Sequence, residues 1–432
     1  MTATASLAGM DTDAVAYDAA SDSASDSASG SAPSSGRLPD PADLISFDSL
    51  LSTEELALRD RVRAFVDAEI KPNIARWYED AHFPLEIVPE LAKLGLLGMH
   101  LHGYGCAGRS AVEYGLAGAE LEAGDSGLRT FVSVQGSLAM SAIHKHGSEA
   151  QKQEWLPQMA AGEAIGCFGL TEPTAGSDPA SMATRARRDG DSPTADWILT
   201  GAKRWIGLAN VAKVAVIWAQ TGEPGDARGI RGFVVPTATP GYTATPIEPK
   251  LSMRASIQCE IDLDEVRLPH DAILPGAVGL KGPFSCLNEA RYGIIWGAMG
   301  AARDAFEDAL EYSKERLQFG KPLASYQLTQ AKLVDMALEI NKGFLLALHL
   351  GRLKDAGKLQ HHQISVGKLN NCREAIAIAR EARTILGGNG ITLDHSPLRH
   401  ANNLESVRTY EGTDEVHTLI LGQQLTGEAA FR

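Results

Sequence analysis

Residues 166–186 have the sequence GCFGLTEPTAGSDPASMATRA, and the pattern of the chain changes within this stretch. Upstream of it, apolar residues recur at helical spacing from about Ser49, as in SLLSTEELALRDRVRAFVDAEI, which opens with Ser and Thr at capping positions. Downstream, short β-rich runs such as AKVAVIWAQ alternate with Gly, Pro and Asp, and TGEPGDARGIRG is typical of a hairpin loop. After Pro275 the helical spacing returns and continues to the end of the chain.

This order predicts an α+β protein with an N-terminal helical domain at 46–165, a middle β domain at 166–275 and a C-terminal helical bundle at 276–432. Residues 1–45 form an acidic tail rich in Ala, Ser and Asp, and we expect it to be disordered because it has little apolar surface to bury. A long apolar stripe in the last domain needs a matching surface, either within the bundle or at a subunit interface. The stripe comprises Leu333, Met336, Ala337, Ile340, Phe344, Ala347 and Leu348.

Composition excludes several classes of protein. Asp and Glu outnumber Lys and Arg by 54 to 40, and no basic patch is visible, so we expect no nucleic-acid partner. No apolar run approaches the ~18 residues of a membrane-spanning helix, so we expect no integral membrane association. The five cysteines lack CxxC pairing and regular spacing, which argues against a disulfide framework and against a metal site. Residues 1–36 lack Lys, Arg and an apolar segment, so we expect a cytoplasmic, bacterial protein rather than an imported or secreted one.

Three glycine-rich segments each allow two interpretations. GYGCAG at 103–108 fits a dinucleotide-binding fingerprint, but no strand is predicted before it, so we interpret it as a connecting loop. Residues 166–186 fit the edge of a flat polar ligand or an ordinary turn-rich loop. LGGNGI at 386–391 fits a phosphate-binding turn or a helix C-cap.

In the segment ERLQFG, Arg316 and Gln318 lie beside Phe319 and suit a pyrophosphate and its base, although surface ion pairing is the commoner use of such an arginine.

TYEGTDEVHTLILG places Glu411 in a tight turn before an apolar helix. A glutamate at this point is either a charge favoured by the helix dipole or a desolvated carboxylate that acts as a base.

Taken together, these segments in this order resemble the acyl-CoA dehydrogenase family over essentially all residues after 45. The glutaryl-CoA dehydrogenases within that family share GYGCAG, GCFGLTEP, GSDP, GPFSCLNEARYGI, LGRLKD, LGGNGI and TYEGT with this chain. The resemblance implies an oxidoreductase and flavoprotein that carries FAD and dehydrogenates an acyl-CoA at its α,β bond. It further implies oxidative decarboxylation of glutaryl-CoA to crotonyl-CoA and CO₂, as in lysine and tryptophan degradation, by a homotetramer.

The resemblance also implies where FAD binds. The flavin and its pyrophosphate would contact Phe168, Leu170, Thr171, Gly176, Ser177, Trp205, Ile206 and Gly207. A second set would reach FAD across a subunit boundary, which would also explain the apolar stripe; it comprises Arg316, Gln318, Phe319, Gln327, Gly387 and Gly388. Two residues that follow the TYEG turn, Thr413 and Glu415, would lie near the cofactor as well.

For the substrate, the resemblance implies that Glu411 is the catalytic base and that Tyr410 is the residue typical of decarboxylating members. One set of polar residues would hold the distal carboxylate of glutarate: Glu122, Arg129, Thr130 and Ser133. A second set would contact the rest of the acyl-CoA: Ser177, Asn288, Arg291 and Gly412. Alternatively, Arg129 forms a structural ion pair with Glu122 or Asp125, because a buried arginine needs an anion.

One departure from the family leaves the electron acceptor open. Gly207 stands where most members have Thr or Ser, and the plant short-chain acyl-CoA oxidases also have WIG there. The acceptor is therefore either an electron-transferring flavoprotein or O₂, and a short-chain or secondary-metabolite acyl-CoA is the alternative substrate. A scaffold that binds FAD or CoA without catalysis is the alternative from another class, and the intact Glu411 argues against it.

Overall fold

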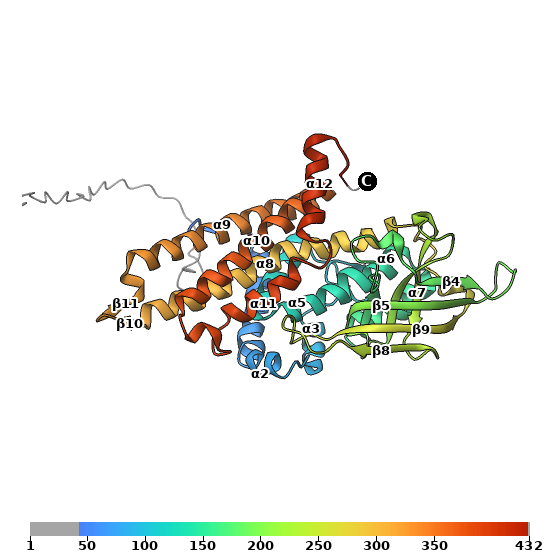
Figure 1. Cartoon of the computed structure of the whole chain (residues 1–432), viewed down its shortest axis with the longest axis horizontal. Helices are drawn as coiled ribbons and strands as arrows, with labels where there is room; N and C mark the ends of the chain where they lie inside the picture. Colours follow the sequence, from blue (N-terminus) through green and yellow to red (C-terminus); the bar gives the residue numbers. More distant parts are fainter. Residues whose placement is uncertain (1–42, 431–432) are drawn as a thin grey trace, which may run out of the picture. The chain divides into compact units, whose positions relative to one another are not determined.

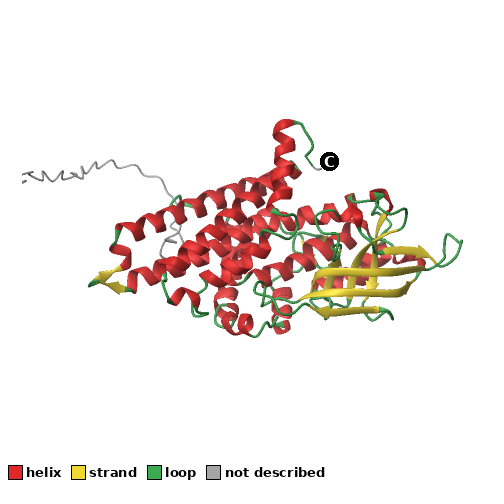
Figure 2. Ribbon diagram, viewed as in Figure 1, coloured by secondary structure: helices red, strands yellow, loops and turns green. Residues whose placement is uncertain are grey.

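The computed structural model describes residues 43–430, which form three successive groups of elements, helical, β and helical (Figures 1 and 2). Apart from its last three residues, the expected disordered tail lies outside the described part of the chain. The predicted α+β class is confirmed.

The first group begins several of its helices at capping boxes. Ser52, Ser110 and Ser148 each accept a hydrogen bond from the backbone N–H three residues later, whose side chain bonds back to the serine N–H. In chain order the group contains η1 (Phe47–Leu50), α1 (Thr53–Phe65), η2 (Val66–Ile70), α2 (Ile74–Glu79), η3 (Leu85–Ile87), α3 (Val88–Lys93), β1 (His102–Gly103), β2 (Cys106–Ala107), α4 (Ala111–Gly124), α5 (Ser126–Ser133), η4 (Val134–Met140), α6 (Ser141–His146) and α7 (Glu149–Ala160).

Helix α4 is the central element of this group, since all of its residues are buried. It packs against α1 and against α8 (Lys281–Glu315) of the last group. The GYGCAG segment is the tight turn of the β1–β2 hairpin, in which His102 pairs with Ala107. The loop interpretation is therefore confirmed, since the preceding strand is only two residues long and no βαβ unit follows.

The middle group forms one seven-stranded sheet. Strand β5 pairs antiparallel with β4 on one side and with β9 on the other, and β9 also pairs antiparallel with β8. Strand β6 pairs parallel with β3 and antiparallel with β7. A single parallel residue pair, Arg185 with Gln220, joins β4 to β6. The β6–β7 connection is the predicted hairpin loop. The group contains β3 (Gly166–Gly169), η5 (Pro179–Ser181), β4 (Arg185–Arg188), β5 (Trp197–Gly207), β6 (Val214–Gln220), η6 (Ala227–Gly229), β7 (Ile230–Pro236), β8 (Tyr242–Pro246), β9 (Gln258–Leu268) and η7 (His270–Ala272).

The last group is a bundle of long helices. It contains α8 (Lys281–Glu315), β10 (Leu317–Gln318), β11 (Lys321–Pro322), η8 (Leu323–Ser325), α9 (Gln327–Asp355), α10 (His361–Ile385), η9 (Asn389–Ile391), α11 (Pro397–Val407) and α12 (Asp414–Thr426). The apolar stripe of α9 is covered within this chain by α8 and α10, where Met336 and Ile340 share a core with Ala298 and Ala375. The bundle interpretation of the stripe is confirmed, and its assignment to a subunit boundary is wrong because neighbouring helices already cover it.

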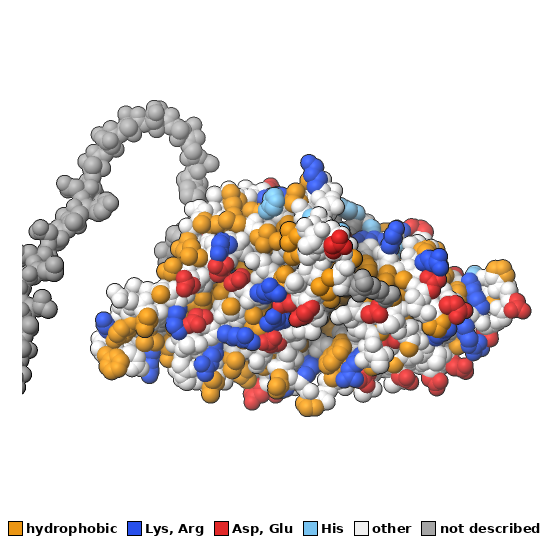
Figure 3. All heavy atoms as spheres, turned by 45° about the horizontal axis from the view of Figure 1, so that its top comes forward, with side chains coloured by type: hydrophobic (Ala, Val, Ile, Leu, Met, Phe, Trp, Pro, Cys, Tyr) orange, Lys and Arg blue, Asp and Glu red, His pale blue; other side chains and the backbone are white. Residues whose placement is uncertain are grey.

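On the face shown in Figure 3, acidic and basic side chains are interspersed, without a broad area of one sign. Among residues 43–430, no helix combines the length and the apolar character needed to cross a membrane.

Candidate active site

The turn between α11 and α12 holds Glu411 in a left-handed backbone conformation. Its φ is 57°, and that of Gly412 is 102°, so two consecutive residues lie in a region that side chains disfavour. Two cations stabilise the turn: half-buried Arg291 donates from Nε to the Glu411 carbonyl at 2.7 Å, and buried Lys368 donates from Nζ to the Gly412 carbonyl at 2.8 Å. A Cβ on Gly412 would lie 2.9 Å from Nε2 of His417, so both the conformation and the packing require glycine there.

The Glu411 carboxyl is desolvated. Its Oε2 is buried and has no hydrogen-bond partner among the described residues. Burial raises the pKa of Glu411 above its ordinary value, and the charges of Arg129, Lys368 and Arg291 oppose that rise. Helix α12 is capped by Thr413 and carries its first-turn acids at Asp414 and Glu415, so Glu411 is not part of that first turn. The geometry therefore favours a base over a helix-dipole charge.

Arg129 of α5 lies next to this turn and is only 2% exposed. Its Nε donates to Glu122 Oε2 at 2.6 Å, and its Nη2 donates to the Tyr410 hydroxyl at 2.6 Å. Thr130 Oγ1 lies 3.1 Å from the same hydroxyl, and Ser133 is buried one helical turn after Arg129. The structure thus brings residues of the set predicted to bind a distal carboxylate, Glu122, Arg129 and Thr130, together with Tyr410, the neighbour of Glu411.

Part of this cluster is left without partners. Among the described residues, Arg129 Nη1 and Glu122 Oε1 have no hydrogen-bond partner although both atoms are buried. An unsatisfied buried donor costs about 1–3 kcal/mol. The Nη1 donor of Arg129 is therefore available to an anionic group brought in by a ligand.

Asp125 does not pair with Arg129. Its carboxylate accepts from Arg399 at 2.6 Å, from Asn403 at 2.9 Å and from the N–H of Gly127 at 2.7 Å, where it caps α5. The alternative of an Arg129–Asp125 ion pair is therefore wrong, whereas the Arg129–Glu122 pair exists and leaves one guanidinium nitrogen unused.

Strand β3 and the loop after it carry the first five predicted flavin-contacting residues. Phe168 and Leu170 are buried, Thr171 is half-buried, and Gly176 and Ser177 are exposed.

A buried ion pair anchors this loop. Glu172 accepts from the backbone N–H groups of Ala183 at 2.6 Å and Thr184 at 3.0 Å, and from Lys203 Nζ at 2.8 Å. Glu172 and Lys203 were not predicted as a pair, because one acid in a loop and one lysine in a strand carry no signal in the sequence that they meet.

An irregularity in the sheet orients Trp205. The β5–β9 register shifts between Lys203 and Ile206, and Trp205 in that interval has a φ of 65° and is 53% exposed. Ile206 is buried, and Gly207 is half-buried. A Cβ on Gly207 would meet one atom within 4 Å, Val134 Cγ2 at 3.8 Å, so packing does not require glycine at this position.

The residues expected to act across a subunit boundary gather around the β10–β11 hairpin and the turn after α10. In Figure 1 the hairpin lies at one end of the bundle, far from the α11–α12 turn. Asn389 Nδ2 bonds to the Tyr312 hydroxyl at 3.1 Å and holds the second turn against α8. All six predicted residues are exposed and are not brought to Glu411 within one chain: Arg316, Gln318, Phe319, Gln327, Gly387 and Gly388.

The remaining predicted residues have local roles. Gly387 has a φ of 57° just after α10, which is the geometry of a helix C-cap. Thr413 accepts from the Val416 N–H at 3.3 Å and caps α12, and Glu415 is exposed on its first turn. Asn288 accepts from Arg291 Nη1 at 3.3 Å and so supports the cation that holds the Glu411 carbonyl.

Three models of one family match the chain: the N-terminal, middle and C-terminal domains of acyl-CoA dehydrogenase, at residues 52–163, 167–266 and 278–426. A mitochondrial short-chain specific acyl-CoA dehydrogenase of Bos taurus is 36% identical over 371 residues, which cover 85% of this chain and 89% of that protein. A glutaryl-CoA dehydrogenase of Mycobacterium smegmatis in complex with FADH2 is 61% identical, with a TM-score of 0.88 over 91% of this chain and 100% of the other. A glutaryl-coenzyme A dehydrogenase–glutaryl-CoA complex is 32% identical, with a TM-score of 0.82 over 88% and 98%.

Proposed function

This chain belongs to the acyl-CoA dehydrogenase family, and we propose that it oxidises glutaryl-CoA and decarboxylates the product to crotonyl-CoA and CO₂. It is an FAD-dependent acyl-CoA dehydrogenase. The observation that carries the substrate assignment is the buried guanidinium of Arg129, which has an unpaired Nη1 and lies against Tyr410, the neighbour of the base. The resemblance to glutaryl-CoA dehydrogenases of known structure supports the same assignment.

The residues present fit FAD. Trp205 and Phe319 expose large aromatic surfaces, at 53% and 96%, that suit coverage by a ring system. Open space surrounds Gly176, Gly387 and Gly388, where an added Cβ would meet nothing within 4 Å, so a ligand can approach the backbone there. When bound, FAD supplies the redox chemistry by accepting the β-hydrogen of the acyl chain as a hydride. Because β5, which carries Trp205, and the β10–β11 hairpin, which carries Phe319, lie at opposite ends of the chain in Figure 1, we further propose that a homotetramer completes each site.

Glu411 removes the α-proton of the thioester. Its desolvated carboxyl is a stronger base than a solvated one, and the positive charges of Arg129, Lys368 and Arg291 oppose the rise of its pKa. Arg129 binds the distal carboxylate and so orients the chain with its α-carbon at the base. After dehydrogenation the bond to this carboxylate breaks, CO₂ leaves, and the remaining dienolate takes up one proton to give crotonyl-CoA. We place that proton on Glu411, which received one in the first step.

A second candidate function is a short-chain acyl-CoA dehydrogenase or oxidase. The similarity to short-chain specific enzymes favours the smaller substrate, and the space beside Gly207 favours O₂ as the acceptor in place of an electron-transferring flavoprotein.

One experiment separates these functions. The purified holoenzyme is mixed anaerobically with glutaryl-CoA, flavin absorbance is followed, and CO₂ and crotonyl-CoA are quantified; butyryl-CoA is the control. We expect rapid bleaching with glutaryl-CoA and stoichiometric CO₂. Flavin bleaching by butyryl-CoA but not by glutaryl-CoA would contradict the assignment of glutaryl-CoA as the substrate. Admitting air to the reduced enzyme then tests whether O₂ reoxidises the flavin.

A further inference from the structure

Helices α4 and α8 touch closely at a glycine next to the Arg129 cluster. A Cβ placed on Gly297 of α8 would lie 1.9 Å from Glu122 Oε2, 2.9 Å from Glu122 Cδ and 3.1 Å from Arg129 Nε. Contacts under 3.0 Å require something to move. Glu122 is fully buried, so its carboxylate has little free space into which it could move.

This contact fixes the position of a carboxylate that orients Arg129. Glu122 Oε2 occupies the space over Gly297 and from there accepts from Arg129 Nε at 2.6 Å. With Nε held by Glu122 and Nη2 held by Tyr410, Nη1 is the nitrogen left without a partner in the described chain. The direction of that free donor therefore depends on the absence of a side chain at 297.

We propose that Gly297 is a specificity-determining position of this enzyme: by admitting the Glu122 carboxylate against the α8 backbone, it positions Arg129 for the distal carboxylate of a dicarboxylic acyl-CoA. The inference rests on the proposed function for the identity of the substrate. Gly297 acts through Glu122 and Arg129, so it is a positioning residue and not a catalytic one.

Ordinary helix packing does not explain this glycine as it explains its neighbours. A Cβ on Gly300 would meet the backbone carbonyl of Ala119 at 1.9 Å, and one on Gly293 would meet the Tyr114 hydroxyl at 2.5 Å. Those two glycines allow close approach of α4 to α8. Of the three, Gly297 faces the charged pair, and both members of that pair have a buried polar atom without a partner.

The test compares Gly297→Ala with Gly118→Ala in the holoenzyme. Gly118 lies on the same α4–α8 interface, but its added Cβ would meet one atom within 4 Å, the Gly293 carbonyl oxygen at 3.8 Å. For Gly297→Ala we expect KM for glutaryl-CoA to rise about ten- to a hundredfold, because a charge-assisted hydrogen bond is lost, while KM for butyryl-CoA stays within about threefold. Gly118→Ala should change neither KM. A folded Gly297→Ala enzyme with an unchanged ratio of the two KM values overturns the proposal.

A double-mutant cycle with Glu122→Ala, measured by Tm, tests the proposal even if Gly297→Ala alone is too unstable for kinetics. Glu122→Ala removes the atoms that the new methyl group would strike, so adding Gly297→Ala to it should leave Tm nearly unchanged, whereas Gly297→Ala alone should lower Tm strongly. Equal effects in both backgrounds would show that Gly297 does not act through Glu122. If the wild-type enzyme oxidises butyryl-CoA but not glutaryl-CoA, the proposed function fails, and so does the role of Arg129 in binding a distal carboxylate. The double-mutant cycle then still decides whether Gly297 positions Glu122.

Discussion

At Glu411, burial and nearby cations act on one carboxyl in opposite directions. Burial raises its pKa, and Arg129, Lys368 and Arg291 lower it. Because the base works only when ionised, the rate rises as the pH passes its pKa. Replacing the positive charge of Lys368 by Lys368→Met should therefore move the acidic limb of the kcat–pH profile to higher pH by about one pH unit. Lys368→Arg should leave that limb in place, and an unmoved limb in the methionine variant would contradict the assigned role.

Arg129 is tested by its substrate dependence. Arg129→Ala removes the donor proposed for the distal carboxylate, so KM for glutaryl-CoA should rise far more than KM for butyryl-CoA. Truncation of a residue that served folding alone would affect both substrates equally, and steady-state kinetics with the two thioesters distinguish these outcomes.

At Gly207 the structure has room for a side chain. Gly207→Thr should leave the free energy of unfolding within about ±0.5 kcal/mol, since the nearest contact of its Cβ is ordinary and no left-handed backbone is required. The same variant tests the oxidase candidate: filling this space should slow reoxidation of the flavin by air, and an unchanged rate would argue against entry of O₂ beside Trp205.

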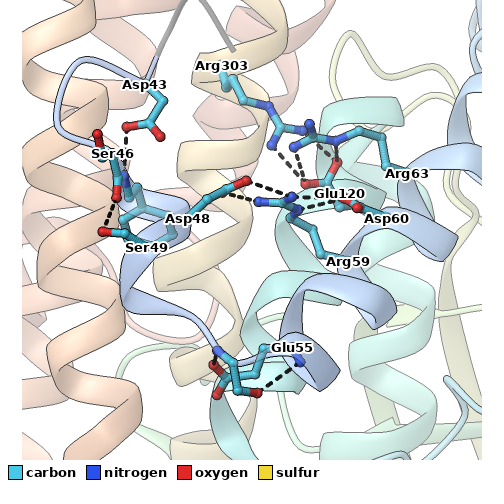
Figure 4. Close-up of polar contacts among 12 residues, drawn as sticks. Asp43, Ser46, Asp48, Ser49, Glu55, Arg59, Asp60, Arg63, Glu120 and Arg303 are labelled. Atoms are coloured by element: carbon cyan, nitrogen blue, oxygen red, sulfur yellow. Dashed lines mark hydrogen bonds and ion pairs between the residues drawn. The ribbon is translucent and has the colours of Figure 1, made fainter. Parts of the chain in front are cut away.

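At the scale of elements, a buried charge cluster joins α1, α4 and α8. Figure 4 shows Glu120 between Arg63 and Arg303. Each arginine makes two hydrogen bonds to its carboxylate, at 2.7 and 2.8 Å. Burial opposes ionisation, but the two arginines hold the pKa of Glu120 well below its ordinary value. Since the folded state depresses this pKa, the stabilisation is complete above pH 4.5, the ordinary value, and is lost as pH falls below it.

Glu120→Gln should lower the free energy of unfolding by about 3–5 kcal/mol, because it leaves two arginines without their buried anion. Urea unfolding at pH 7 measures the loss. Glu90→Gln is the matched control: its carboxylate pairs with Lys93 on the exposed face of α3, so we expect little change. Equal effects of the two substitutions would show that the cluster does not stabilise the packing of these helices.

The spacing of apolar residues predicted those helices and strands whose pattern lies within one continuous stretch of sequence. The buried strand β6 and the long helices of the bundle follow from apolar spacing, as does the loop that joins β6 to β7. The π-helical turn η4 at Val134–Met140 and the burial of every residue of α4 were not foreseen, since both depend on what packs around them.

The site was predictable only in part. Motifs and the family resemblance predicted Glu411, Tyr410 and Arg129 as site residues, but not the hydrogen bond that Tyr410 accepts from Arg129, 281 positions away in the chain. Lys368, His417 and Gly297 were missed because nothing near them in the sequence indicates which distant groups they meet.

At the scale of the whole molecule, the proposed FAD site predicts that a second copy of the chain covers the exposed residues around Phe319. Phe319 is 96% exposed in the β10–β11 hairpin, which lies far from the α11–α12 turn in Figure 1, so we expect the oligomer to retain FAD and the isolated chain to lose it. Dilution that dissociates the oligomer, followed by light scattering against the chain mass of 45.9 kDa, should release flavin in step with the loss of mass. Phe319→Ala should weaken flavin retention while Tm of the apoprotein stays unchanged. A monomer that keeps its flavin would refute the shared site.

The contact between Gly297 and Glu122 also constrains the order in which this enzyme can diverge. A larger residue at 297 fits without displacing its neighbours only after the glutamate has been shortened or lost, because a Cβ there would lie 1.9 Å from Glu122 Oε2. Loss of the glutamate in turn leaves Arg129 buried without its anion, so the arginine must be replaced next. We therefore expect relatives that do not use dicarboxylic substrates to replace Glu122 and Arg129 together, and to carry a larger residue at 297 only where Glu122 has been replaced.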